Sequence, residues 1–222
     1  MRAGLFVNGD FEKTERIMNQ ISKLDLIVAV DGGLNHITHS GLSPDIIIGD
    51  LDSIELDDQE YFKNLGVNII QFPTHKDDTD LELAVEHVIN LGFHEILIFG
   101  ATGSRVDHFL GNILQFSNPD LLKYQIKIFT KDSEIFYCNK NQTIEGSEGD
   151  TVSLIPISDV VTGIKTSGLL FALENEDLFR WKCRGLSNQM VERVVEVKFD
   201  TGVLLCVHSF NLQDQIVQEN EK

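Results

Sequence analysis

Short apolar runs alternate with longer amphipathic segments over about the first 130 residues of the chain. The runs are rich in Val, Ile and Leu and do not alternate with polar residues, which is typical of strands buried on both faces of a sheet. We therefore predict strands at Ala3–Val7, Leu26–Val30, Asp45–Ile48, Val67–Phe72, Glu95–Phe99 and Ile126–Phe129.

Two of the intervening segments carry apolar residues at helical spacing. One lies between Leu81 and Ile89. The other begins at Asp107, whose side chain we expect to cap the free N–H groups of the first turn. Strands that alternate with helices in this way predict an α/β domain, with an open, mostly parallel sheet covered by helices on both faces.

The pattern changes near Lys131, after which the apolar segments are short and separated by turn signals such as Asp200-Thr201-Gly202. They predict an antiparallel β-sandwich, in which the segments on either side of that turn form a β-hairpin. The expected strands are Glu134–Cys138, Thr151–Ile155, Leu169–Leu173, Val191–Phe199 and Val203–Val207. We place the domain boundary between residues 130 and 131, which gives domains of residues 1–130 and 131–222.

The overall charge and the cysteines restrict the classes of partner. The formal net charge is −17, and nucleic acids and anionic membrane surfaces are bound by Lys and Arg in excess, so we expect neither as a partner. Cys138, Cys183 and Cys206 form no CxxC pair, which suits a reducing compartment. We find neither a signal peptide nor an apolar stretch of about 18 residues, and we therefore expect a cytoplasmic protein.

Acidic residues follow four of the predicted strands, at or just beyond their C-terminal ends. Taken singly, Asp and Gly after a strand are ordinary turn residues. In a parallel sheet, however, these strand ends share one edge, and ligands bind in the crevice outside it. Asp50 and Asp52 also have the spacing of a clamp for a divalent cation such as Mg²⁺, which can in turn hold phosphates. The acids expected at this rim are Asp31, Asp50, Asp52, Asp77, Asp80 and Asp107.

The segment from Gly100 to Arg105 follows a predicted strand and opens a helix, as phosphate-binding loops do. It is neither a Walker A loop nor a GxGxxG motif. Gly100 and Gly103 still allow backbone N–H groups to approach a phosphate, and Arg105 can bind phosphate oxygens through two hydrogen bonds. The simpler interpretation of Arg105 is a surface arginine paired with Asp107, and His108, in the first turn of the helix, has the position of a structural residue.

The complete set of motifs resembles, in order and spacing, the thiamin pyrophosphokinase family. The N-terminal motifs are Asp31-Gly32-Gly33, Gly49-Asp50-Leu51-Asp52-Ser53, Asp77-Asp78-Thr79-Asp80 and Gly100-Ala101-Thr102-Gly103-Ser104-Arg105-Val106-Asp107-His108. In the C-terminal half, Gly168–Leu173 and Gly185-Leu186-Ser187-Asn188 look like the thiamin-binding segments of that family. The resemblance covers nearly the whole chain.

The resemblance implies an ATP-binding catalytic domain over 1–130, a thiamin-binding and dimerisation domain over 131–222, and a homodimer with thiamin between subunits. The implied reaction moves the diphosphoryl group of ATP to the thiamin hydroxyl and releases AMP. Asp50, Asp52 and Asp77 match the acids around Mg²⁺ and the phosphates. The other matched positions are Asp31, Gly32, Gly33, Asp80, Gly100, Gly103, Arg105, Asp107 and His108 for the nucleotide site, and Phe171, Ser187 and Asn188 for thiamin.

Two matched positions raise chemical questions. Phe171 falls where many members carry Trp or Tyr, so it keeps an aromatic face for stacking but lacks a polar group. Phosphoryl transfer also needs a group that accepts the proton of the attacking hydroxyl, and Asp80 and Asp107 are the candidates for that base.

Two other functions fit parts of the sequence. Ile46–Ile54 is close to the aspartyl-nucleophile motif of haloacid dehalogenase-type phosphatases, although that motif normally lies on the first strand and rarely has Ile at the position of Ile54. The second alternative is a module that binds a nucleotide or thiamin without catalysis. Loss of acids would favour such a module, yet every expected acid is present.

Overall fold

The computed structural model describes residues 1–52, 54, 56–73 and 77–211. Ser53 of the third-strand motif therefore lies outside the described residues. The chain divides into two compact units, Met1–Lys131 and Asp132–Lys222. Within the described residues, no helix is both long and apolar enough to cross a membrane.

The first unit contains a parallel sheet with the strand order β6-β5-β1-β2-β3-β4. Its strands are β1 (Arg2–Phe6), β2 (Leu26–Val30), β3 (Ile46–Gly49), β4 (Asn68–Gln71), β5 (Glu95–Phe99) and β6 (Gln125–Phe129). Each lies within or close to an apolar run of the sequence, and the predicted α/β fold with a mostly parallel sheet is confirmed. All six carboxyl ends therefore meet at the same edge.

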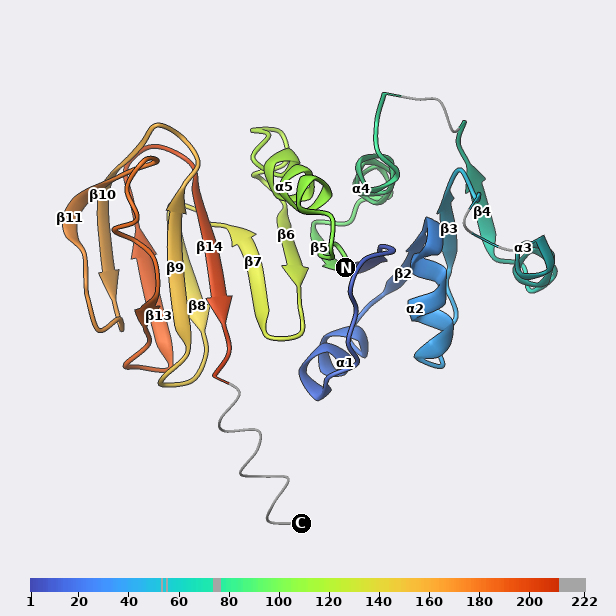
Figure 1. Cartoon of the computed structure of the whole chain (residues 1–222), viewed down its shortest axis with the longest axis horizontal. Coiled ribbons are helices and arrows are strands. Elements are labelled where there is room, and N and C mark those ends of the chain that lie inside the picture. Colours follow the sequence, from blue (N-terminus) through green and yellow to red (C-terminus); the bar gives the residue numbers. More distant parts are fainter. Residues whose placement is uncertain (53, 55, 74–76, 212–222) are drawn as a thin grey trace, which may run out of the picture. The chain divides into compact units, whose positions relative to one another are not determined.

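Helices cover both faces of this sheet, as Figure 1 shows, with α4 and α5 on the face opposite α1 and α2. On β5, Leu97 and Phe99 belong to the apolar cluster formed with α1, α2 and α3, whereas the buried residues Ile96 and Ile98 face the other way. The helices are α1 (Glu15–Ile21), the short 3₁₀ helix η1 (Asp31–Gly33), α2 (Leu34–His39), α3 (Leu56–Asn64), α4 (Asp80–Asn90) and α5 (Val106–Gln115).

The two helices that follow acidic motifs begin in different ways. At the start of α4, the Thr79 hydroxyl accepts a hydrogen bond from the N–H of Glu82, and the Glu82 carboxylate accepts one from the N–H of Thr79. At the start of α5, Arg105 occupies the N-cap position without a side-chain cap. Asp107 is the second residue of the helix, and its carboxylate pairs with Arg105 and also accepts hydrogen bonds from the N–H groups of Asp107 and His108, as the predicted role in the first turn requires.

The second unit is an antiparallel β-sandwich, as the sequence predicts. One sheet has the order β12-β9-β14-β7, and the other has the order β11-β10-β13-β8. The two sheets enclose a core that includes Phe136, Leu154, Ile164 and Val197. The strands are β7 (Ser133–Tyr137), β8 (Asn141–Glu145), β9 (Thr151–Pro156), β10 (Val160–Ser167), β11 (Glu174–Phe179), β12 (Asn188–Gln189), β13 (Val194–Lys198) and β14 (Leu204–Ser209).

Two predictions for this unit are wrong. β13 and β14 do not form a hairpin, because β13 pairs with β8 and β10 while β14 pairs with β7 and β9 in the other sheet. The turn between them is tied to Thr162, which accepts a hydrogen bond from the N–H of Asp200 and donates one to the carbonyl of Thr201. Leu169–Leu173 is not a strand either, since it makes an isolated bridge between Leu169 and Met190 and then turns outward.

Candidate functional site

The strand order fixes where the first unit can bind a ligand. From β1 the chain adds β2, β3 and β4 on one side, and it then returns to place β5 on the other side of β1. The crevice between the loops after β1 and β5 is the usual ligand site of such a sheet. These loops are joined by three backbone hydrogen bonds, which run from Val7 to Phe99 (2.8 Å), from Gly9 to Gly100 (2.7 Å) and from Asp10 to Thr102 (2.5 Å).

Two glycines allow the loops to approach so closely. Gly100 has a φ of +72° and lies against the carbonyl of Val7, while Gly9 lies against the carbonyls of Gly100 and Thr102. Gly103, in contrast, is exposed and has room for a side chain. Sequence reasoning missed the β1 loop, although Asn8-Gly9-Asp10 follows a strand in the same way as the other acidic motifs.

Asp31 lies at the C-terminal end of β2, in a left-handed conformation with a φ of +47°. Its Oδ1 atom is buried and has no hydrogen-bond partner in the described structure. Burial, the hydrogen bond with Asp80 and the charges of Asp80 and Asp50 together raise the pKa of Asp31 to about 7, against a smaller opposing effect of the Leu51 N–H. Gly49 lies directly against this oxygen, where any side chain would overlap it.

Asp50 and Asp52 flank a buried leucine at the end of β3. Leu51 has a φ of +66° and packs into the apolar core, which leaves both acids at the sheet edge. The N–H of Asp52 donates to Oδ1 of Asp50 over 3.0 Å. The charge of Asp50, followed by a hydrogen bond between the two side chains, raises the pKa of the Asp52 carboxyl.

The structure thus brings together four of the predicted acids, which are Asp31, Asp50, Asp52 and Asp80. Asp77 is exposed on the loop before α4, and its approach to the other acids stays a prediction. The repulsion within the cluster and the unpaired oxygen of Asp31 fit a divalent cation, which would offset the charge. Among the described His, Cys, Asp and Glu side chains, no three form a ready-made metal site.

Arg105 and Asp107 form an exposed ion pair with each other. Nε and Nη2 of Arg105 lie 3.2 and 2.5 Å from the two carboxylate oxygens of Asp107, and both side chains are 66% exposed. Chiefly through this hydrogen bonding, the pKa of Asp107 is lowered to about 2. A carboxylate with so low a pKa accepts a proton poorly. While it is paired with Arg105, Asp107 is therefore the weaker of the two candidate bases. His108 lies exposed beside the pair in the first turn of α5.

The second unit contains a pocket of about 260 Å³, and two of the three predicted thiamin residues line it. Phe171 presents its ring with 64% of the residue exposed, and Asn188 lies beside it. The remaining wall consists of Leu154, Leu173, Arg184, Gly185 and Leu186. A hollow that combines a free aromatic face with a few polar groups suits a flat ring system.

The side-chain amide of Asn188 makes two hydrogen bonds to the backbone of Phe171. Its Oδ1 accepts a hydrogen bond from the N–H of Phe171 over 3.0 Å, and its Nδ2 donates to the Phe171 carbonyl over 2.7 Å. Ser187 precedes it with a φ of +56°, and the N–H of Ser187 donates to the hydroxyl of Ser153. Asn188 thereby acts on the pocket by fixing the aromatic residue.

Comparisons with known proteins match both units in chain order. Residues 17–130 match the family model described as "Thiamin pyrophosphokinase, catalytic domain", and residues 134–204 match "Thiamin pyrophosphokinase, vitamin B1 binding domain". The chain belongs to the thiamin pyrophosphokinase family. It is 31% identical over 208 residues to Thiamine pyrophosphokinase 1 of Oryza sativa subsp. japonica, covering 81% of this chain and 77% of the relative.

Further thiamin pyrophosphokinases resemble the chain in sequence and fold. The Bacillus subtilis enzyme is 27% identical over 186 residues, which cover 83% of this chain and 87% of the relative. A crystal structure of thiamine pyrophosphokinase from that organism superposes with a TM-score of 0.85 at 24% identity, over 96% of this chain and all of the other. The crystal structure of the yeast enzyme superposes with a TM-score of 0.78 at 20% identity, over 94% of this chain and 86% of the yeast chain. At these identities the structural likeness supports the fold.

The raised pKa of Asp31 predicts a pH-dependent effect of Asp31→Asn on stability. Because the folded pKa of about 7 lies above the ordinary value of 3.8, the folded state holds an extra proton between these values, and wild-type stability falls as pH rises toward 7. The amide avoids this cost. We expect Asp31→Asn to raise the free energy of unfolding at pH 8 by about 2 kcal/mol, after allowance for partial solvent screening.

Urea unfolding at pH 5 and pH 8 would measure this difference, which should fall to less than half at pH 5. Asp58→Asn on the exposed side of α3 is a matched control, since it removes the same formal charge outside the cluster. Equal, pH-independent effects of the two substitutions would show that Asp31 carries no buried-charge cost.

Proposed function

We propose that this chain transfers the diphosphoryl group of ATP to the hydroxyl of thiamin, giving thiamin diphosphate and AMP. The observation that carries the proposal is the acid cluster of Asp31, Asp50, Asp52 and Asp80, gathered at the ligand-binding edge of the parallel sheet. The family match and the aromatic pocket in the second unit support it.

In this proposal, residues 1–130 bind the nucleotide. Asp50, Asp52 and Asp77 hold Mg²⁺, which neutralises phosphate charge when bound. The nucleotide site is lined by two groups of residues. One is Gly32 and Gly33 at the end of β2, and the other is Gly100, Gly103 and His108 around the start of α5. Arg105 is exposed and held only at the surface by Asp107, so its guanidinium can exchange that carboxylate for phosphate oxygens of ATP.

The proton of the attacking hydroxyl is taken by Asp80 in this scheme. Asp80 already shares a hydrogen bond with Asp31, so a proton that reaches Asp80 has a second carboxyl nearby to stabilise it. The resemblance to the family, rather than any measured spacing, selects attack on the β-phosphorus and release of AMP. The chain positions the reactants, as diphosphoryl transfer requires.

Residues 131–222 bind thiamin. Phe171 stacks on a ring of the substrate, while Asn188 fixes the backbone of Phe171, and Ser187 lies at the rim near the aminopyrimidine. The exposed apolar residues around this site, which include Leu170, Leu186 and Val191, support an interface there. We further propose a homodimer formed through this domain. A cytoplasmic location is also part of the proposal, and cell fractionation would test it.

The alternatives have less support. A haloacid dehalogenase-type enzyme would place its nucleophile on the first strand, whereas Asp50 follows β3. A binding module without catalysis would not need four clustered acids. In this cluster burial and the neighbouring acids raise the pKa of Asp31, and the charge of Asp50 raises the pKa of Asp52.

The reaction itself is the first test. Purified protein incubated with ATP, Mg²⁺ and thiamin should produce AMP and thiamin diphosphate in equal amounts, because the β- and γ-phosphates travel together. Chromatography or phosphorus NMR would identify the products. ADP with thiamin monophosphate, or free phosphate without thiamin, would contradict the proposal.

Asp52→Asn provides the control for that assay. The variant should lose at least about a hundredfold in turnover, since it weakens the hold on Mg²⁺ and the phosphates, while its circular dichroism spectrum stays unchanged. Near-normal activity at saturating Mg²⁺ would exclude Asp52 from the metal site.

Phe171→Ala tests the thiamin pocket. Stacking contributes to binding of thiamin without touching the phosphates, so the KM for thiamin should rise about tenfold, with less than a twofold change in the KM for ATP. Steady-state kinetics with each substrate varied in turn would measure both. Equal effects on the two substrates, or none, would assign Phe171 a packing role only.

The proposed homodimer predicts the mass of the protein in solution. Sedimentation equilibrium at micromolar concentration should give about twice the chain mass of 25.0 kDa, because most homo-oligomers form closed two-fold pairs. A fully active monomer at the same concentration would rule the dimer out.

A further inference from the structure

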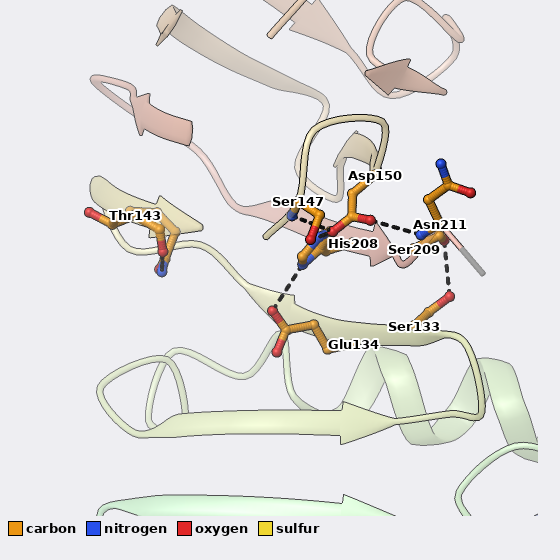
Figure 2. A network of polar contacts seen from close by, with 9 residues as sticks. Ser133, Glu134, Thr143, Ser147, Asp150, His208, Ser209 and Asn211 are labelled. Carbon is orange, nitrogen blue, oxygen red and sulfur yellow. Dashed lines mark hydrogen bonds and ion pairs between the residues drawn. The ribbon is translucent and has the colours of Figure 1, made fainter. Parts of the chain in front are cut away.

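A charged network lies inside the sandwich, apart from the residues discussed so far (Figure 2). His208 of β14 is completely buried, with Glu134 of β7 and Asp150 just before β9 on its two sides. Nδ1 of His208 lies 3.2 Å from Oε1 of Glu134, and Nε2 lies 3.0 Å from Oδ2 of Asp150. The edge of the Phe210 ring packs beside the imidazole, at 4.8 Å between centroids.

Hydrogen-bond chemistry fixes the number of protons in this network. A neutral imidazole has one donor and one acceptor, whereas both ring nitrogens of His208 face carboxylate oxygens. The arrangement is satisfied when the imidazole carries both protons, or when one of the two carboxyls is protonated. Among the described residues, Glu134 and Asp150 are the charged groups that face the ring. Without the extra proton, two acceptors would oppose each other in a buried site.

Asp150 extends the network into the loop before β9. Its Oδ2 also accepts a hydrogen bond from the N–H of Ser147 over 2.9 Å, and its Oδ1 accepts one from the N–H of Asn211 over 2.7 Å. The carboxylate thus joins the 147–150 turn to the end of β14, as the dashed lines in Figure 2 show. Charged acceptors buried with several donors hold a fixed geometry.

The same turn carries the segment that shapes the thiamin pocket. The N–H of Met190 donates to the carbonyl of Asp150 over 2.8 Å, and the N–H of Gly149 donates to the carbonyl of Met190 over 2.9 Å. On its other side, this segment holds the Phe171 loop, because the N–H of Leu170 donates to the carbonyl of Gln189 and the Asn188 amide holds Phe171. A continuous series of contacts therefore runs from His208 to the backbone of Phe171, whose ring is exposed.

We propose that His208, held between Glu134 and Asp150, is a positioning residue for the thiamin pocket. The network fixes the 147–150 turn, the turn fixes residues 188–190, and those residues hold Phe171 at the angle needed for stacking. This assignment rests on the proposed function for its substrate, but the mechanical link from His208 to Phe171 does not. An exposed aromatic ring on a loop needs such support, since a freely moving ring would lose binding energy on being ordered.

Hydrogen exchange followed by mass spectrometry tests the mechanical link without any substrate. In His208→Gln, peptides covering residues 168–171 and 188–191 should exchange about fivefold faster or more, while a peptide covering β13 stays at the wild-type rate. Ser209→Ala is the matched control. It removes the 2.9 Å contact between the Ser133 and Ser209 hydroxyls, which joins the same two strands one residue away. Unchanged exchange at 168–171 and 188–191 in His208→Gln would overturn the proposal.

Kinetics test the consequence for the substrate. We expect His208→Gln to raise the KM for thiamin about five- to tenfold, with kcat and the KM for ATP within twofold, since the network lies in the second unit and the nucleotide site is proposed in the first. Ser209→Ala should match the wild type. Selective exchange without a change in the KM for thiamin, or equal losses for both substrates, would contradict the positioning role.

The proposal can still be tested if His208→Gln does not fold or if the wild type proves inactive. If His208→Gln does not fold, Glu134→Ala carries the test, because it removes the partner of Nδ1, leaves the contact between His208 and Asp150 in place, and should give a smaller effect in the same direction. No effect of Glu134→Ala on exchange at 168–171 and 188–191 would then overturn the proposal. If the wild type does not turn over thiamin, the proposed function fails, while the exchange measurement still decides the link between His208 and Phe171.

Discussion

Carboxylates that are crowded, and in part buried, at one edge of the parallel sheet are the feature on which the chemistry of the first unit depends. The shared direction of β2 and β3 brings Asp31 and Asp50 to the same edge, and α4 adds Asp80. Holding these groups so close has local costs. Asp31 and Leu51 adopt left-handed conformations, and position 49 has to be glycine because a side chain there would overlap Asp31. Because the carboxylates repel one another, a cation bound among them with its phosphates would offset their negative charge and stabilise the arrangement.

The second unit has a different task, which is to hold an exposed aromatic ring in place. Phe171 lies outside the sandwich core and is kept in place by backbone contacts from Asn188. One series of hydrogen bonds links the exposed ring of Phe171 to the buried network around His208. In this arrangement the ring would contact the substrate, while the network only holds the ring in place. A substrate would meet the ring, whereas water does not reach the imidazole.

Much of this molecule follows from its sequence. The Val- and Ile-rich runs identified the parallel strands because burial on both faces leaves a continuous apolar pattern. Acids after those runs could be assigned to one edge from the direction of the strands alone. The pair of Arg105 with Asp107 also follows from their spacing, whereas the hydrogen bond between Asp31 and Asp80 depends on side-chain rotamers, which no spacing reveals. The predicted hairpin was wrong because Asp200-Thr201-Gly202 indicates only a tight turn. Such a turn suits a chain that stays in one sheet and a chain that changes sheets equally well.

The change of sheet at residues 200–202 affects how the sandwich is assembled. β14 lies next to β7, so that Ser209 pairs with Ser133 across 76 residues of chain. A local hairpin would have let the last strands form early, but here one sheet is completed only when the end of the domain reaches its beginning. Closing such long loops slows folding and leaves strand edges open in the meantime. During synthesis, β7 must wait for nearly the whole domain before it gains this neighbour.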